Sequence, residues 1–121
     1  MTDPDELRLA LTQFTGTETW FRHPFGGGTT FTEGVKFFAE NAGNGAFWLL
    51  DIFMTELVAL QRKEGFLGIK LTVSPDSKAT ITADDGNDRI LWGHEVVLTD
   101  CPVGEWTFFF TDDVLLLPSE Y

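Results

Sequence analysis

Apolar residues recur at helical spacing in the first half of the chain and at every second position in the second half. Asp3, a capping residue followed by proline at the first helical position, predicts a helix that runs to about Gln13. Thr32 is a second capping residue and predicts a helix over 33–41. Residues 47–61 are apolar around most of a helical wheel, so we expect a largely buried third helix there.

Two short segments between the first two helices favour extended structure. Residues 17–23 are rich in β-forming side chains and predict a strand. Residues 29–31 are expected to pair back on it as a hairpin. Pro24 and the run Gly26–Gly28 predict a flexible turn between the two segments.

From Phe66 onward the apolar period is two residues, which is typical of half-buried strands. Turn signals at 85–87 and 112–113 separate these segments. Strands are predicted over residues 66–73, 78–84, 90–98, 106–110 and 114–117. Strands at spacings of about ten residues, with turns between them, favour an antiparallel meander.

The order of elements, helices first and strands second, makes the chain α+β. We expect a single domain over residues 1–121, with N-terminal helices packed on a C-terminal antiparallel β-meander of about four to five strands. Phe109 and residues 114–117 put apolar groups on both faces of the last strands. Either the N-terminal elements or a second subunit is expected to cover the second face, so a homodimer stays open.

Acids outnumber bases along the chain, and the imbalance is greatest toward the C-terminus. The net charge is −11, and no lysine or arginine follows Arg89. A field of one sign repels nucleic acid and anionic membrane and attracts basic protein surfaces. We therefore predict a basic protein partner, with no direct binding to nucleic acid or membrane. The acids assigned to this binding surface are Asp84, Asp85, Asp88, Glu95, Asp100, Glu105, Asp112, Asp113 and Glu120.

The sharpest form of this prediction is a non-enzymatic inhibitor that mimics nucleic acid. Most of the C-terminal acids fall in turns or at strand ends, where a rigid rim of carboxylates suits a groove built for phosphates. Small, acidic, single-domain chains are typical of the anti-defence proteins of mobile elements, anti-CRISPR proteins among them. By this analogy the partner is a basic nucleic-acid-binding complex.

The composition indicates in which cellular compartment the protein resides and what fills its core. Cys101 is the only cysteine, so the chain forms no internal disulfide, which suits a reducing compartment. The first residues are acidic where a signal peptide needs bases, and the longest apolar run, 46–50, is too short to span a bilayer. We expect a cytoplasmic protein. Twelve phenylalanines against one tyrosine indicate rings that mostly fill a dry core.

Several stretches spread along the chain follow one pattern. They are FTGTE at 14–18, WFRH at 20–23, FWLLD at 47–51 and TDDVLLLPSEY at 111–121. Together they resemble a family of small bacterial and mobile-element proteins that is catalogued only as a domain of unknown function. The resemblance extends from about residue 12 to the end and implies kinship without an activity. The chain departs from the pattern at Gly26–Gly28, where a more polar or basic loop is expected.

The two histidines are candidates for chemistry. His23 and His94, with Asp51 or Glu56, could form a metal or acid–base site, but neither histidine belongs to a local ligand pattern. His94 shares a strand face with apolar residues and is expected to be packed and hydrogen-bonded. A small enzyme that uses His23, Arg22 and a carboxylate such as Asp51, in a pocket between helix and sheet, is the alternative function.

Other motifs lack a defining feature. The acids around Gly86 do not have the spacing of a calcium loop, and Gly26–Gly28 is not followed by the lysine of a P-loop. Acidic neighbours are expected to raise the pKa of the Cys101 thiol, which disfavours a cysteine nucleophile. Ser119 lacks the flanking glycines of a serine-hydrolase nucleophile elbow. We therefore predict no catalytic residue, no metal and no cofactor.

Trp20, Arg22 and His23 form an alternative binding patch. An exposed tryptophan–arginine pair is typical of a binding hot spot. The other interpretation is a strand whose tryptophan packs inward and whose arginine pairs with Glu18 or Glu33.

Overall fold

A computed structural model describes residues 2–16 and 18–121. In this part of the chain the helices are α1 (Pro4–Leu11), α2 (Glu33–Asn41), α3 (Phe47–Glu56), α4 (Val58–Glu64) and the short 3₁₀ helix η1 (Pro118–Glu120). The strands are β1 (Trp20–Arg22), β2 (Thr30–Thr32), β3 (Phe66–Val73), β4 (Ala79–Asp84), β5 (Ile90–Val96), β6 (Gly104–Thr111) and β7 (Val114–Leu116). The predicted α+β class is confirmed. No helix of the described residues is long and apolar enough to cross a bilayer.

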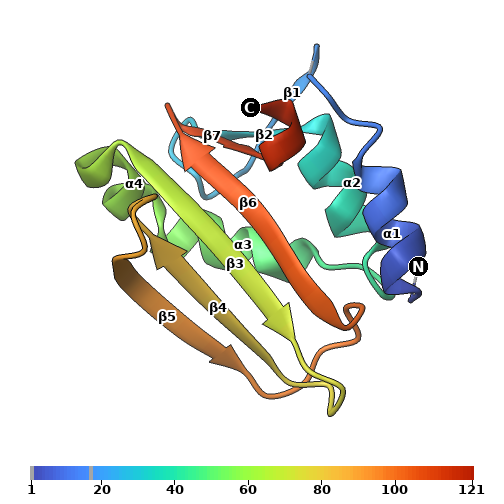
Figure 1. Ribbon diagram of the computed structural model, residues 1–121. Helices are drawn as coiled ribbons and strands as arrows, with labels where there is room; N and C mark the ends of the chain where they lie inside the picture. The colour runs from blue at the N-terminus through green and yellow to red at the C-terminus, as the bar shows by residue number, and fades with distance from the viewer. Residues whose placement is uncertain (1, 17) are drawn as a thin grey trace.

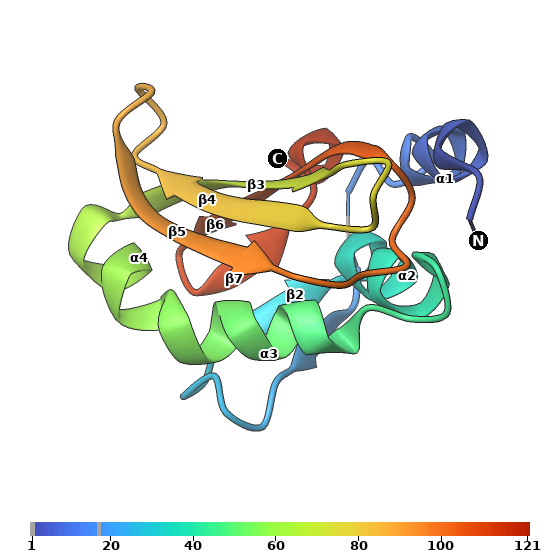
Figure 2. The same cartoon turned by 90° about the horizontal axis from the view of Figure 1, so that it is seen from below.

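Helix α3 covers one face of the long strands. Figure 1 shows β6, β3, β4 and β5 side by side with α3 behind them, and Figure 2 shows α3 running beneath the same strands. Helices α1 and α2 pack on each other beyond β6, while η1 lies on the side of the sheet opposite α3. No helix of the described residues covers the face of β3, β4 and β5 that points away from α3 (Figure 2).

The strands form one sheet in the order β1-β2-β7-β6-β3-β4-β5. Only β3, β4 and β5 make a meander, because β6 pairs along its whole length with β3 rather than with β5. The predicted N-terminal hairpin forms, although its first predicted residue, Thr17, lies outside the described residues. Strand β2 then joins the C-terminal strands by running parallel to β7. The alternation of side chains predicts strands but not their neighbours, since the period is two residues whichever strand lies alongside.

The two helix caps predicted from the sequence are present in the structure. The carboxylate of Asp3 accepts hydrogen bonds from the backbone amides of Asp5 and Glu6 at the start of α1. The Thr32 hydroxyl accepts one from the amide of Val35 at the start of α2. These contacts confirm both predicted helix starts, because each satisfies a backbone donor that the first turn leaves unpaired.

The single helix predicted over 47–61 is two helices that meet at Leu57. Leu57 has φ −111° and ψ −9°, so it ends α3 and begins α4. Its amide still donates to the carbonyl of Phe53, and its own carbonyl accepts from the amide of Gln61. These two hydrogen bonds span the bend. Because apolar residues continue through the bend, the sequence pattern shows no interruption there.

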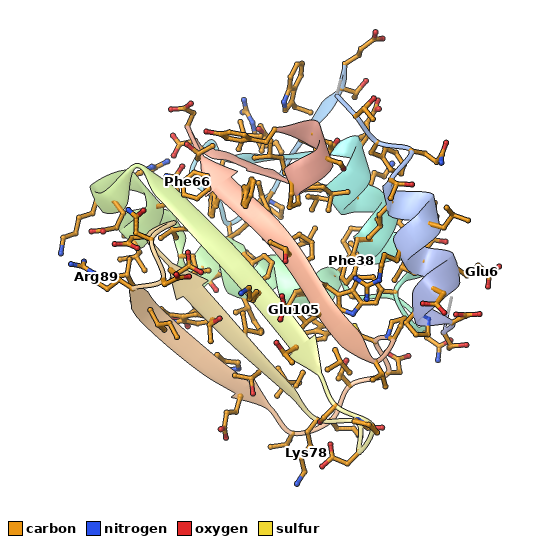
Figure 3. The ribbon with its side chains drawn as sticks, viewed as in Figure 1. Glu6, Phe38, Phe66, Lys78, Arg89 and Glu105 are labelled. Carbon is orange, nitrogen blue, oxygen red and sulfur yellow. The ribbon has the colours of Figure 1, made fainter. Side chains whose placement is uncertain are left out.

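Phenylalanine rings fill the space between the helices and the covered face of the sheet. Phe38 on α2, labelled in Figure 3, meets Phe108 on β6 edge-to-face with ring centroids 5.1 Å apart. Phe53 on α3 contacts the same Phe108 ring at 5.6 Å. All three are buried, which confirms the predicted core, whereas Phe25 and Phe47 are exposed. Truncating one such ring to alanine costs about 3–5 kcal/mol.

The edge strand β5 is more exposed than the sequence predicts. His94, expected to be packed, is exposed, and its ring stacks on Trp92 with 7° between the ring planes. That prediction is wrong because β5 is the last strand of the sheet and no further strand of the described chain covers it. Ile90, Val97 and Leu98 are also exposed, at 65%, 83% and 77%.

Candidate functional site

A groove lies where β1, β2 and β7 meet the end of β6. Strand pairing places Trp20 beside Thr32 and Thr30 beside Val114, so these side chains share one face of the sheet. The groove has a volume of about 340 Å³. Its lining residues are Trp20, Thr32, Thr111, Asp112, Val114, Leu116, Glu120 and Tyr121. We call it the aromatic–carboxylate groove.

Two exposed aromatic rings line this groove. Trp20 on β1 is 52% exposed, and Tyr121, which follows η1, is 74% exposed. The Tyr121 ring stands edge-on to Phe66 and Phe109, with centroid separations of 6.0 and 5.4 Å. Phe66 lies at the start of β3, at this end of the sheet (Figure 3). Rings that are held in place yet exposed are typical of recognition surfaces.

Glu120 supplies one carboxylate of the groove and is held by three hydrogen bonds. Its Oε1 accepts from the Thr32 hydroxyl at 2.6 Å and from the Leu117 amide at 3.0 Å, and its Oε2 accepts from the Gly34 amide at 3.3 Å. The charge therefore lies at the N-terminus of α2, where the helix dipole stabilises an anion. A Cβ on Gly34 would lie 2.6 Å from Glu120 Oε1, so a larger residue there would have to displace the bound carboxylate.

The second carboxylate comes from the turn between β6 and β7. Asp112 and Asp113 have positive φ angles of 52° and 60°, as a two-residue hairpin turn of type I′ requires. The tight turn predicted at these residues is therefore present. Asp112 is exposed and lines the groove. Within residues 2–16 and 18–121, its carboxylate has neither a hydrogen-bond donor nor an ion-pair partner.

Asp113, next in sequence, is engaged by α4 instead. Its Oδ1 accepts hydrogen bonds from Arg62 Nε and Gln61 Nε2, both at 3.1 Å, and its amide donates to Gln61 Oε1 at 2.7 Å. The hydrogen bond from Arg62 holds the pKa of the Asp113 carboxyl below its usual value, and the bond from Gln61 adds to that shift. Of two adjacent acids, one is bound by the fold and the other is available at the groove.

The acids of the β4–β5 turn organise that turn. Asp84 Oδ1 accepts from the Gly86 amide at 2.8 Å, and Asp85 Oδ1 accepts from the Asn87 amide at 2.9 Å. Asp85 also lies 3.7 Å from Arg89. These contacts fit a hairpin turn, the structure that the acids around Gly86 were expected to form.

The other predicted acids are spread over the molecule. Asp100 accepts a hydrogen bond from the Asn44 amide at 2.8 Å. Glu105 lies 3.8 Å from a lysine of β3 and is labelled in Figure 3. Asp88 and Glu95 are exposed, the first in the β4–β5 turn and the second on β5. The nine predicted acids thus have unequal environments and do not form one cluster.

His23, predicted for the alternative patch, is buried at 6% exposure immediately after β1. Its Nε2 lies 2.8 Å from Asp51 Oδ1 on α3, and its Nδ1 accepts a hydrogen bond from the Phe25 amide at 3.1 Å. Because Nδ1 is the acceptor, the ring proton resides on Nε2, which donates to Asp51. Nε2 therefore connects the loop after β1 to α3, while Nδ1 holds a turn within the loop itself.

The glycine-rich loop after His23 is anchored at several points, although the sequence predicts a flexible turn. A Cβ on Gly26 would lie 1.9 Å from Thr29 Oγ1, so the chain packs closely on itself there. The Thr29 hydroxyl donates to the Gly26 carbonyl at 2.8 Å. Arg62 Nη2 donates to the Gly27 carbonyl at 3.0 Å. The arginine that binds Asp113 thus also holds this loop.

The residues of the alternative patch therefore separate. Trp20 lines the groove, and its exposure contradicts the interpretation in which it packs inward. Arg22 is exposed and, within the described chain, has no ion pair with Glu18 or Glu33. His23 is committed to Asp51.

The alternative enzyme site is only partly assembled: His23 and Asp51 lie 2.8 Å apart, but the two histidines do not converge. His23 follows β1 at one edge of the sheet, whereas His94 lies on β5 at the other edge. Burial raises the pKa of the Cys101 thiol, and the charge of Asp100 acts in the same direction, so the reactive thiolate is disfavoured. Among the described residues no three acidic, histidine or cysteine side chains are grouped as a metal site would need.

Comparison with protein-family models matches residues 5–121 to a family of unknown function, DUF6876. The chain belongs to DUF6876. The resemblance to a domain of unknown function is thus confirmed. No curated protein and no solved structure matches the chain.

The groove of this DUF6876 member is built mainly from the stretches that carry the family resemblance. Residues 111–121 supply six of its eight lining residues, and the stretch 20–23 supplies Trp20. The same stretch also supplies His23, whose partner Asp51 ends the stretch 47–51. Sequence analysis missed Tyr121, Thr32 and Thr111 as site residues. The one available signal was that the ending stretch combines acids with the single tyrosine.

Proposed function

We propose that this DUF6876 member is a non-catalytic protein that binds a basic protein surface through the aromatic–carboxylate groove. The observation that carries the proposal is the available carboxylate of Asp112 in a groove with the exposed rings of Trp20 and Tyr121. The lining contains two carboxylates and no lysine or arginine. Aromatic faces and carboxylates both attract cationic side chains, so the groove suits a basic partner.

The acids around the groove support the same proposal. Strand β3 begins opposite the end of β6, and β4 ends opposite Gly68 near the start of β3. The turns β4–β5 and β6–β7 therefore lie at the same end of the sheet. Six of the nine predicted acids belong to this end: Asp84, Asp85, Asp88, Asp112, Asp113 and Glu120. Arg62 and Arg89 offset two of these charges, and the remaining excess of acid attracts a basic partner at long range.

The most specific version of this proposal is that the basic partner is a nucleic-acid-binding complex. If the acidic end of the sheet occupies a phosphate-binding groove, duplex DNA and this protein compete for one site on that complex. We expect a basic nucleic-acid-binding complex isolated from the host with this protein to release it when duplex DNA is added. Simultaneous binding of both would restrict the proposal to a basic protein that does not use the same surface for nucleic acid.

The adjacent aspartates provide a matched test of the groove. Asp112→Asn and Asp113→Asn each remove one negative charge at neighbouring positions, but only Asp112 lines the groove. With a short peptide rich in lysine and arginine as probe, we expect Asp112→Asn to weaken binding about ten-fold, or about 1.4 kcal/mol. Asp113→Asn is expected to change it less than about two-fold beyond any loss of folded protein.

The two aspartate variants distinguish binding in the groove from attraction by the overall negative charge. Equal weakening by both variants would show that only overall charge matters and would overturn the groove as the contact. Arg22 lies on the same strand as Trp20 and is exposed without a carboxylate partner in the described chain. Arg22→Ala is therefore expected to strengthen binding of the basic peptide. Isothermal titration calorimetry at two salt concentrations measures both effects, and both are expected to shrink as salt rises.

A further inference from the structure

The two threonine hydroxyls of the groove have already donated their hydrogens. The Thr32 hydroxyl donates to Glu120, and the Thr111 hydroxyl donates to the backbone carbonyl of Gly65 at 2.9 Å. Asp112 and Glu120 are acceptors as carboxylates. Apart from the N–H and O–H on the two aromatic rings, the groove therefore presents side-chain acceptors. A ligand that fits it must bring several donors and a positive charge.

We infer that the groove receives an arginine side chain of the basic partner, an inference that rests on the proposed function. The guanidinium group is planar, permanently charged, and has five N–H donors and no acceptor. It can lie against an aromatic face while its edge meets a carboxylate. A lysine ammonium is a compact charge with a strong hydration shell, and it gains less from the aromatic faces.

Asp112 is the carboxylate that can bind the guanidinium edge-on. Both oxygens of Glu120 already accept hydrogen bonds, two on Oε1 and one on Oε2. Asp112 has no such partner in the described chain, so both of its oxygens are available for a bidentate pair. Its backbone is fixed by the β6–β7 turn, which Asp113 fastens to α4. Asp112 is thus presented from a rigid support.

The Tyr121 ring and the backbone that carries Trp20 are positioned independently of any ligand. Tyr121 is held edge-on by Phe66 and Phe109. Trp20 belongs to β1, whose pairing with β2 continues through Arg22 opposite Thr30. A site whose rings are already ordered loses less side-chain entropy when the ligand binds. The arrangement therefore favours a planar cation over a flexible one.

The test uses the full chain and three peptides that differ at one position, which is arginine, lysine or citrulline. Citrulline has the shape of arginine without its charge. The indole N–H signal of Trp20, assigned with Trp20→Phe, is followed by NMR during each titration. We expect the arginine peptide to bind at least about five-fold more tightly than the lysine peptide, and the citrulline peptide to give no saturable shift.

Two variants and the possible outcomes show whether the arginine site fails alone or together with the proposed function. Asp112→Asn is expected to abolish the preference for arginine over lysine. Asp113→Asn is expected to retain it, because asparagine keeps the backbone amide and a side-chain oxygen that can accept from Arg62 and Gln61. Equal binding of arginine and lysine peptides would overturn the inference and leave the basic-partner proposal standing. Equal binding of the citrulline peptide would overturn both. If no peptide shifts Trp20 while the basic probe still binds in an Asp112-dependent way, the arginine site is wrong and the proposed function remains.

Discussion

His23 Nε2 and Asp51 Oδ1 lie 2.8 Å apart and join the end of β1 to α3 across 28 positions of sequence. The imidazole is buried at 6% exposure, while the carboxylate side chain is 58% exposed. A typical hydrogen bond within a protein contributes about 0.5–1.5 kcal/mol to stability. The pair holds the loop that follows Trp20, so it also fixes the strand from which one ring of the groove projects.

The first prediction separates the two nitrogens of His23. His23→Ala removes both contacts and is expected to lower the free energy of unfolding by about 1–3 kcal/mol. His23→Asn offers an acceptor near the position of Nδ1, so the Phe25 amide keeps a partner and the loss is expected to be smaller. Urea unfolding followed by tryptophan fluorescence measures both. Equal losses for the two variants would contradict the importance of the Phe25 contact.

The second prediction concerns acid and Asp113. Its pKa is lowered in the folded state by Arg62, so the stability it contributes is complete above the unfolded pKa of about 3.9 and is lost as pH falls through the folded value. Because the pair is exposed, the contribution is expected to stay below about 1 kcal/mol. Asp113→Asn should therefore lose less stability than wild type between about pH 6 and pH 2. Denaturant unfolding at several pH values checks this, and Asp112→Asn serves as the control.

The third prediction reverses the usual effect of alanine in a helix. Gly→Ala in a helix interior normally stabilises it by about 1 kcal/mol. At Gly34 the added Cβ would lie 2.6 Å from Glu120 Oε1 and from Leu117 Cδ1, so we expect a loss of about 1–3 kcal/mol instead. The pair Gly34→Ala with Glu120→Ala is expected to lose less than the sum of the two single variants. Thermal unfolding of all three provides the comparison, and strict additivity would contradict the contact.

The fourth prediction concerns the free edge of β5. Ile90 is exposed, and the strand contains no lysine, arginine or proline that would discourage pairing with another chain. Ile90→Lys is expected to reduce self-association at high protein concentration. Sedimentation equilibrium measures the first quantity. If wild type and variant are equally monomeric, the homodimer that the sequence left open does not form through this edge.

Local features of the fold could be predicted from the sequence because neighbouring residues cause them. Asp3 and Thr32 cap helices through amides two or three positions away. The alternation from Phe66 onward predicts the long strands, since one buried face imposes a period of two. The bend at Leu57 was not predictable in this way. The contacts that direct α4 come from Asp113, which is far away in sequence.

The candidate site depends even more than the fold on contacts between residues that are distant in sequence. From the sequence, Asp112 and Asp113 are equivalent acids, and Trp20 belongs with Arg22 and His23. Only the tertiary structure binds Asp113 to Arg62, buries His23 against Asp51, and leaves Asp112 in one groove with Trp20 and Tyr121.

The sequence by itself determined the helix caps, the strand period and the excess of acid. The order of strands, the parallel entry of β2 beside β7 and the composition of the groove were decided by tertiary structure. The physical reason is that net charge and the spacing of apolar residues are properties of the chain itself and can be read from it without knowing the fold. Whether a carboxylate is available depends on which distant donors the folded chain brings to it.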